Sequence, residues 1–168
     1  MTAEPLLRAA SDRDEAALLA LFDEAVEWLL DRGQPGQWGT EPWSQAERSR
    51  AAVRAMIAGG GLSLLEEDGV VIAALELGER WDWVAAAQEP EMYVRLLLVA
   101  RTHAGRAIGA ALLRRAAARA RDAGVDLLRV DCWAQAPTLV AFYERCGFVK
   151  AGTFTQDGWR GQVFEQRV

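Results

Sequence analysis

The stretch "LLLVARTHAGRAIGAALLRRAAARARDAG", residues Leu96 to Gly124, decides the fold. An apolar run ends at Val99, a short loop follows, and an alanine-rich helical pattern continues to about Ala123. Gly124 stands where a C-terminal cap is expected. We predict a buried strand that leads directly into a helix beginning near Ala104. The first N–H groups of such a helix have no partner and, together with the helix dipole, favour a phosphate or pyrophosphate.

The loop consists of small residues that leave its backbone accessible to a ligand, and Arg106 adds a positive charge there. It lacks the Gly-Lys-Ser/Thr ending of a P-loop and the third glycine of a dinucleotide-binding turn. A tight strand-to-helix turn packed with small side chains is the alternative interpretation. The small residues are Ala104, Gly105, Ala107, Gly109 and Ala110.

Composition excludes several classes of protein. The 168 residues are 51% hydrophobic and carry a formal net charge of −5, which argues against a nucleic-acid partner. The sequence has no apolar run long enough to span a membrane, and its start does not resemble a signal peptide. We expect one cytoplasmic domain over residues 1–168, with no membrane partner.

Cysteine and histidine are too scarce for a metal site or a disulfide framework. Cys132 and Cys146 are the only cysteines and His103 is the only histidine. Two thiols outside any CxxC spacing indicate reduced cysteines, and we expect no metal.

The remaining patterns predict an α/β fold with a central mixed, mostly antiparallel sheet of six to seven strands flanked by about four helices. Asp68-Gly69 marks a hairpin between two apolar runs. Ser44 with Glu47 predicts a capping box at a helix start, and Ser11 or Asp12 with Glu15 predicts another. Helical patterns cover about residues 12–32, 44–58, 104–123 and 137–146; strand patterns cover about 5–10, 62–67, 70–81, 92–99, 125–134, 148–154 and 160–168.

Two segments together resemble the GNAT superfamily of acyl-CoA N-acyltransferases. "LLLVARTHAGRAIGAALL" is followed by "DLLRVDCWAQAPTLVAFYERCGF", and "FYERCGF" (Phe142 to Phe148) matches the superfamily's aromatic-Tyr-Glu-x-x-Gly-Phe signature. The start "LLRAASDRDEAALLALF" is also similar to the usual first strand and helix, so the resemblance covers nearly the whole chain. It implies a GNAT-like domain that uses acetyl-CoA as co-substrate.

The resemblance also implies roles for particular residues. Backbone groups of Leu98 and Val99 would bind the pantetheine arm, and Tyr143 would contact the cofactor and protonate the leaving thiolate. The pyrophosphate would bind the amides of Ala104, Gly105, Arg106, Ala107, Ile108, Gly109 and Ala110. Thr102, Ala104 and Ala136 depart from the family pattern, which usually has Gln or Arg, Arg, and Asn at these positions.

A base must accept the proton of the acceptor amine. We predict Glu76 for this role, with Glu91 and Asp131 as alternative carboxylates that would contact the acceptor. His103 is a weaker candidate because it lies in the cofactor loop. Each carboxylate has the alternative interpretation of a surface salt bridge.

Four of the seven tryptophans fall in the two segments that flank the acceptor channel in this fold. Trp faces bind cations and flat apolar groups. We expect at least one to contact the acceptor, although packing onto the sheet is the alternative for each. They are Trp38, Trp43, Trp81 and Trp83.

These features predict an N-acetyltransferase that transfers an acetyl group from acetyl-CoA directly to a primary amine of a small molecule or peptide. A homodimer is possible. The alternatives are a catalytically weak or inactive acyl-CoA-binding sensor with the same fold, favoured by the three departures, and an unrelated nucleotide-binding α/β protein.

Overall fold

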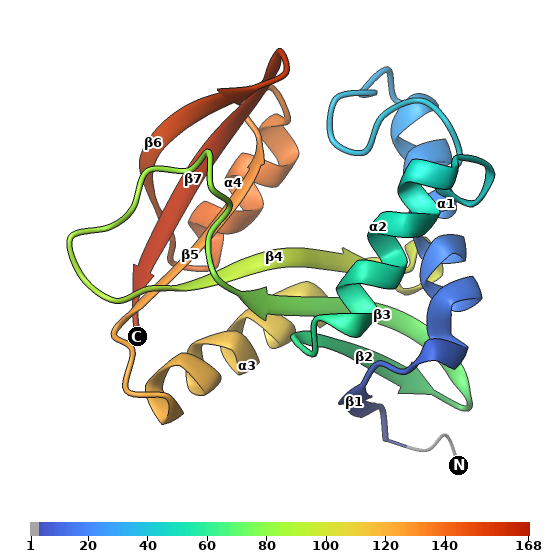
Figure 1. Cartoon of the computed structure of the whole chain (residues 1–168), viewed down its shortest axis with the longest axis horizontal. Helices are drawn as coiled ribbons and strands as arrows, with labels where there is room; N and C mark the ends of the chain where they lie inside the picture. The colour runs from blue at the N-terminus through green and yellow to red at the C-terminus, as the bar shows by residue number, and fades with distance from the viewer. Residues whose placement is uncertain (1–3) are drawn as a thin grey trace. The chain divides into compact units, whose positions relative to one another are not determined.

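The computed structural model describes residues 4–168, and its strands form one mixed sheet in the order β1-β2-β3-β4-β5-β7-β6 (Figure 1). This confirms the predicted α/β class, with seven strands and four α-helices among the described residues. The strands are β1 (Leu6–Ala9), β2 (Leu62–Glu67), β3 (Val70–Gly78), β4 (Met92–Val99), β5 (Leu127–Trp133), β6 (Val149–Gln156) and β7 (Trp159–Arg167). The helices are α1 (Glu15–Leu30), α2 (Glu47–Ala58), α3 (Ile108–Asp122) and α4 (Pro137–Arg145), with 3-10 turns η1 (Asp12–Asp14), η2 (Trp43–Gln45) and η3 (Arg101–His103).

The contacts of the chain divide it into two compact units. The first contains the chain up to Glu76 together with Leu96–Gly109, and the second contains Leu77–Arg95 together with Ala110–Val168. Each is described by itself.

In the first unit α1 and α2 lie side by side and cover one face of its strands (Figure 1). Apolar residues of α1 recur at helical spacing, so one face of the helix is buried. Leu18 and Phe22 of α1, Val53 of α2 and Leu64 of β2 are completely shielded from solvent. The predicted hairpin is confirmed, because Asp68 (φ 51°) and Gly69 (φ 79°) form the two-residue turn between β2 and β3.

Both predicted capping boxes differ from the structure. The Ser11 amide donates to Asp14 Oδ2 at 2.7 Å, so the partner is Asp14 rather than Glu15, because a 3-10 turn precedes α1. At α2 the N-cap is Ala46, and the Ser44 amide instead donates to Asp23 Oδ1 at 3.1 Å.

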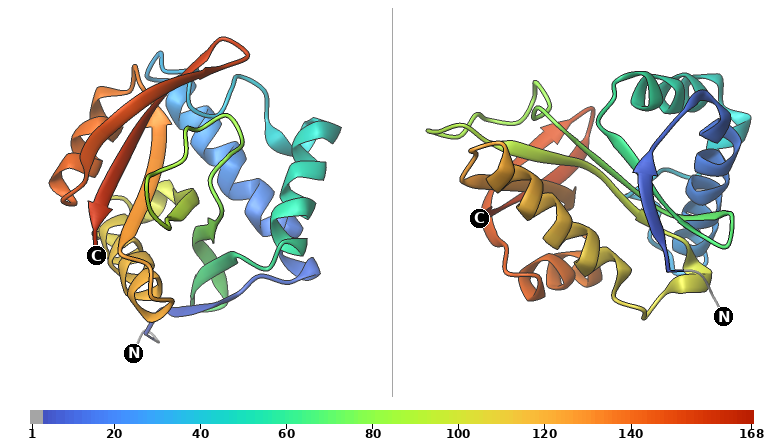
Figure 2. Two further views of the ribbon diagram at one scale, coloured as in Figure 1. Left: turned by 60° about the vertical axis from the view of Figure 1, so that its left-hand side comes forward. Right: turned by 90° about the horizontal axis from the view of Figure 1, so that it is seen from below.

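In the second unit β5, β7 and β6 form antiparallel pairs, and β6 and β7 make a long twisted hairpin (Figure 2). Asp157 (φ 50°) and Gly158 (φ 80°) form the two-residue turn of that hairpin. Pro137 begins α4, where its missing N–H costs nothing. Val84, Tyr93 and Val163 form a small buried cluster on this sheet.

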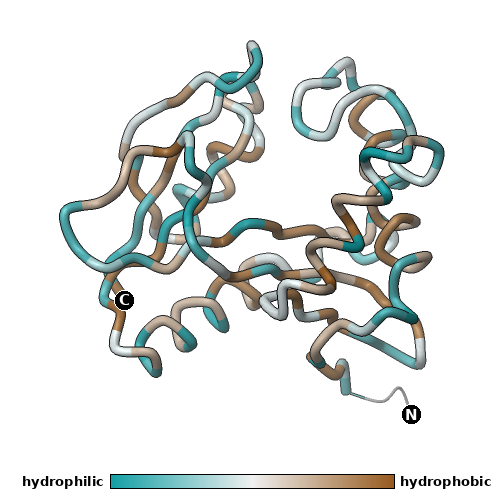
Figure 3. Tube along the Cα trace, in the orientation of Figure 1, coloured by the Kyte–Doolittle hydropathy of each residue, from teal (hydrophilic) through white to brown (hydrophobic). Residues whose placement is uncertain are grey.

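The long helix begins later than predicted. α3 starts at Ile108 and not near Ala104, because the turn η3 and a left-handed Ala107 (φ 57°) stand between β4 and the helix. Its end is as predicted: Gly124 (φ 72°) donates to Arg121 and Val125 donates to Ala120. Hydrophilic and hydrophobic residues alternate along α3, as expected of a helix with one buried face (Figure 3).

The ladder between β4 and β5 is short. The two strands are parallel, and their register joins Met92–Val94 of β4 with Leu128–Val130 of β5. β4 then continues to Val99, and β5 is in register with β7 over its whole length, from Leu127 to Trp133.

Candidate active site

The loop after β4 presents backbone amides in an unusual conformation. Gly105 has a φ of 79°, and a Cβ placed there would have no neighbour within 4 Å. Ala107 has a φ of 57°, which an L-residue rarely adopts. The first N–H groups of α3, from Ile108, have no partner within the helix. The loop and the start of α3 therefore contain backbone N–H groups without a helical partner, and an anion site here stays a prediction.

A carboxylate on the β2–β3 hairpin holds this loop. Glu67 accepts two hydrogen bonds from the Arg106 guanidinium, at 2.8 and 2.6 Å. It also lies 3.1 Å from Nε2 of His103, whose Nδ1 is 2.8 Å from the Thr102 hydroxyl. Arg106, and then His103, lower the pKa of Glu67 to about 2. Arg106 and His103 thus have a structural role, which the sequence did not reveal because Glu67 is far away along the chain.

Arg101, just ahead of the loop, is held by α1. Its amide donates to Glu24 Oε2 at 3.0 Å, and its guanidinium lies 3.6 Å from the ring centre of Trp28. The Arg32 guanidinium contacts the same ring at 3.8 Å. Burial, and then the positive charge of Arg32, lower the pKa of Arg101. These contacts fix the point at which β4 becomes the loop.

Tyr143 lies in the second unit, on α4, and is 5% exposed. Its ring packs against Phe142, Phe148 and Phe164, with ring centres 5.1, 5.9 and 5.4 Å away. Burial is the main cause that raises the pKa of its phenol, and Cys132 also contributes. The phenol therefore stays protonated and can donate a hydrogen bond.

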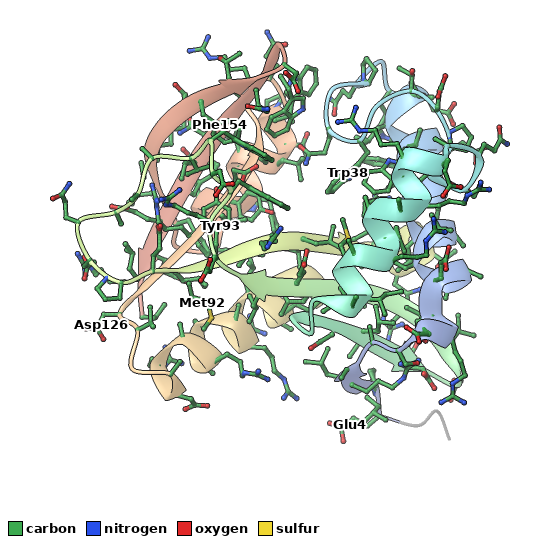
Figure 4. The ribbon with its side chains drawn as sticks, in the orientation of Figure 1. Glu4, Trp38, Met92, Tyr93, Asp126 and Phe154 are labelled. Carbon is green, nitrogen blue, oxygen red and sulfur yellow. The ribbon has the colours of Figure 1, made fainter. Side chains whose placement is uncertain are left out.

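A buried tyrosine on β4 and a partly buried aspartate on β5 form a hydrogen-bonded pair in the second unit. Tyr93, labelled in Figure 4, is fully buried, and its hydroxyl donates to Asp131 Oδ2 at 2.6 Å. Burial raises the pKa of Asp131 to about 6, and the hydrogen bond from Tyr93 counteracts part of that rise. Asp131 was predicted as a site residue, but Tyr93 was not.

Of the other two predicted carboxylates, Glu91 is partly buried and Glu76 is buried. Glu91 accepts a 2.5 Å hydrogen bond from Arg129, and Arg80 lies 3.4 Å away. Arg129 also donates to the carbonyl of Ala85 at 2.9 Å, so this ion pair anchors the β3–β4 segment. Glu76, the last residue of the first unit, is 5% exposed and is in register with Leu62 of β2.

The four tryptophans form two separate groups, one in each unit. Trp43 stacks on Phe22 with ring centres 3.8 Å apart, and Trp38 meets both rings edge-on. This group packs onto the core of the first unit. In the second unit Trp81 stacks on Trp83 at 5.3 Å. Trp83 is 44% exposed, so this second group is the more accessible one.

Over residues 4–168 no set of three His, Cys, Asp or Glu side chains could hold a metal ion. Cys132 and Cys146 are both free thiols, and burial raises the pKa of Cys132 to about 12. None of the described helices has the length and apolar character needed to cross a membrane.

The seven-stranded mixed sheet and the loop that leads from β4 into α3 define an α/β fold with a strand–loop–helix motif at its centre. The family model of the GNAT acetyltransferases matches residues 20–148. The chain therefore belongs to the GNAT acetyltransferase family.

Individual proteins are similar over nearly the whole chain. The uncharacterized N-acetyltransferase YesJ of Bacillus subtilis is 28% identical over 161 residues, which is 92% of this chain and 86% of YesJ. A GNAT-family acetyltransferase structure from Listeria monocytogenes has a TM-score of 0.73 at 20% identity and covers 100% of both chains. The putative acetyltransferase YncA of Salmonella typhimurium, solved with acetyl-CoA, has a TM-score of 0.65 at 19% identity and covers 98% of this chain and 94% of YncA.

Proposed function

We propose that this protein is an acetyl-CoA-dependent N-acetyltransferase that transfers the acetyl group directly to a primary amine. The observation that carries the proposal is the loop at 104–110, whose left-handed Gly105 and Ala107 leave amides accessible ahead of α3. Family membership supports acyl transfer. The bound acetyl-CoA of the YncA structure supports this cofactor.

In the proposed complex the loop amides bind the pyrophosphate. The backbone groups of Leu98 and Val99, at the end of β4, bind the pantetheine arm, as the resemblance to the GNAT superfamily implies. Arg106 already pairs with Glu67, so its charge offsets that carboxylate rather than adding a free cation. The amides therefore supply most of the affinity for the phosphates.

We assign to Tyr143 the role of stabilising and protonating the leaving thiolate. Its raised pKa makes complete proton transfer to sulfur less favourable than from an ordinary phenol, whereas a hydrogen bond to the developing negative charge stays favourable. We therefore propose that Tyr143 first stabilises the thiolate by donating a hydrogen bond, and that the proton follows.

Two carboxylates are candidates for the base, Glu76 and Asp131. Asp131 has a pKa of about 6, so it is ionised at neutral pH yet a better proton acceptor than an ordinary aspartate. We therefore favour Asp131 and keep Glu76 as the second candidate. Activity that persists in Asp131→Asn and disappears in Glu76→Gln would reverse this assignment.

Calorimetric titration with acetyl-CoA tests the cofactor, with CoA, ATP and NAD as comparison ligands. Micromolar or tighter binding of acetyl-CoA, followed by release of CoA in the presence of a panel of primary amines, is the expected result. Absence of binding would overturn the proposal. Binding of ATP or NAD that is as tight as the binding of acetyl-CoA would also overturn the proposal.

A second function, acyl-CoA binding without catalysis, is favoured by one observation. Ala136 is the N-cap of α4 and is 2% exposed, so its methyl group supplies no polar atom at the position where the family usually has Asn. Tight acetyl-CoA binding with no CoA release on any amine would support this function instead.

A further inference from the structure

Arg95 of β4 is held rigidly within the second unit. Its guanidinium lies 3.9 Å from the ring centre of Trp81, which in turn stacks on Trp83. On the strand side it passes over Gly78, where an added Cβ would lie 3.0 Å from Arg95 Cδ. The Arg95 side chain therefore runs between the backbone of Gly78 and the indole ring of Trp81, and that ring covers one face of the guanidinium.

This cation lacks an anionic partner in the described chain. Among residues 4–168 the structure has no ion pair for Arg95, and its Nε is buried without a hydrogen-bond partner. Arg80 and Arg129, from the same unit, both pair with Glu91. A buried donor without a partner costs free energy, so its retention calls for an explanation.

A carboxylate from the neighbouring strand lies on the same face of β4. Tyr93 and Arg95 are two residues apart on a strand, so their side chains point to the same face. The Tyr93 hydroxyl reaches Asp131 on that face. One face of the sheet therefore presents two groups: the Arg95 guanidinium, which has no ion pair within residues 4–168, and the Asp131 carboxylate, which accepts a hydrogen bond from Tyr93.

We propose that Arg95 binds the carboxylate of the acceptor, so that the acceptor class is amines bearing a nearby carboxylate, such as free amino acids. The planar guanidinium matches a carboxylate through in-plane N–H groups, and Trp81 contacts the face of the guanidinium rather than that edge. Asp131 receives the amine end of the same molecule. This inference rests on the proposed acetyl transfer and names its substrate class.

Arg95 otherwise has only a structural role, attaching the β3–β4 segment to the strand through Trp81. The two roles differ in what they affect. A structural role affects folding and every acceptor equally, whereas a binding role affects only acceptors that carry the anion.

Matched acceptors test the proposal: amino acids, their carboxamides and their decarboxylated amines. In the wild-type protein we expect kcat/KM for the acids to exceed that for the carboxamides by tenfold or more. Arg95→Gln should remove that preference, mainly through a rise in KM for the acids, while leaving the carboxamides within about twofold. Arg95→Lys should restore part of it. Arg115→Gln, an exposed arginine of α3, is the control with the same change of charge.

Binding is measured separately from turnover. The fluorescence of Trp81 and Trp83 should respond to amino acids in the presence of CoA, and Arg95→Gln should weaken that response at least tenfold. Failure of acetyl transfer with retained amino-acid binding would overturn the proposed function but not the site. Equal kcat/KM for acids and carboxamides, or an equal loss for all acceptors in Arg95→Gln, would overturn the inference.

Discussion

The hydroxyl of Tyr93 donates a 2.6 Å hydrogen bond to Asp131 and partly offsets the effect of burial on that carboxyl. The ionisation of Asp131 on β5 thus depends on Tyr93 of the neighbouring parallel strand β4. The pair has consequences both for activity and for stability, and they can be measured independently.

Removing the hydroxyl should move the titration of Asp131. In Tyr93→Phe we expect the pKa of Asp131 to rise above its value of about 6, because the hydrogen bond that lowers it is lost. If Asp131 is the base, the rise of kcat/KM with pH should shift to higher pH by the same amount. NMR titration of the carboxyl and a pH–rate profile check the two shifts. A profile that stays in place while the carboxyl titration moves would exclude Asp131 as the base.

Asp131 should also make stability depend on pH. Its folded-state pKa of about 6 exceeds the ordinary value of 3.8, so its contribution is fully present below about pH 3.8 and is lost as pH rises through 6. The loss amounts to about 3 kcal/mol at most. Asp131→Asn keeps an acceptor for Tyr93 and has no charge to bury, so its advantage over the wild type in urea unfolding should grow from pH 4 to pH 8. An advantage that is the same at both pH values would show that Asp131 ionises normally.

The element order and the turns could be predicted from the sequence, because they depend on local patterns. Asp68-Gly69 and Asp157-Gly158 adopt the left-handed turns that such pairs favour. The start of α3 could not be predicted from the sequence. Alanine is the best helix former, so the sequence does not indicate that Ala107 adopts a left-handed conformation before the helix.

The partners at the site depend on long-range contacts. Tyr93 meets Asp131 only through the register of two parallel strands, and Glu67 meets Arg106 only once the hairpin has formed. Ser44 precedes Glu47 by three residues, as a capping box requires, but its amide is bound by Asp23 of α1. No spacing rule within one segment contains this information.

Two substitutions at Gly105 separate backbone strain from charge. A Cβ meets no atom there, so Gly105→Ala adds only the cost of a left-handed conformation, about 1 kcal/mol. Gly105→Asp adds a negative charge beside the proposed pyrophosphate. We expect calorimetry to give a loss of acetyl-CoA affinity of less than tenfold for alanine and of more than a hundredfold for aspartate. Similar losses for the two variants would place the pyrophosphate elsewhere. Gly60, also left-handed and open, provides the control: Gly60→Asp should leave acetyl-CoA binding unchanged.

The two tryptophan groups should respond differently to substitution. Trp43 stacks directly on the buried Phe22, so Trp43→Ala should lower the free energy of unfolding by about 3–5 kcal/mol. Trp83 is 44% exposed, so Trp83→Ala should cost less than about 1.5 kcal/mol. Urea unfolding compares the two variants. An equal loss of unfolding free energy in the two variants would mean that Trp83 stabilises the fold more than its exposure indicates.

The hairpin of β6 and β7 depends on a bare position beneath an aromatic ring. A Cβ at Gly161 would lie 2.3 Å from Cζ of Phe154, which is far inside van der Waals contact. Gly161→Ala must therefore displace the ring and should lower the free energy of unfolding by about 1–3 kcal/mol. Phe154→Leu removes the atoms that clash, so the double variant should lose less than the sum of the two single variants. The coupling free energy from urea unfolding measures this relief. Additive losses would mean that the backbone conformation at Gly161, and not the Phe154 ring, requires glycine. We do not expect this outcome, because the φ of Gly161 is outside the left-handed range.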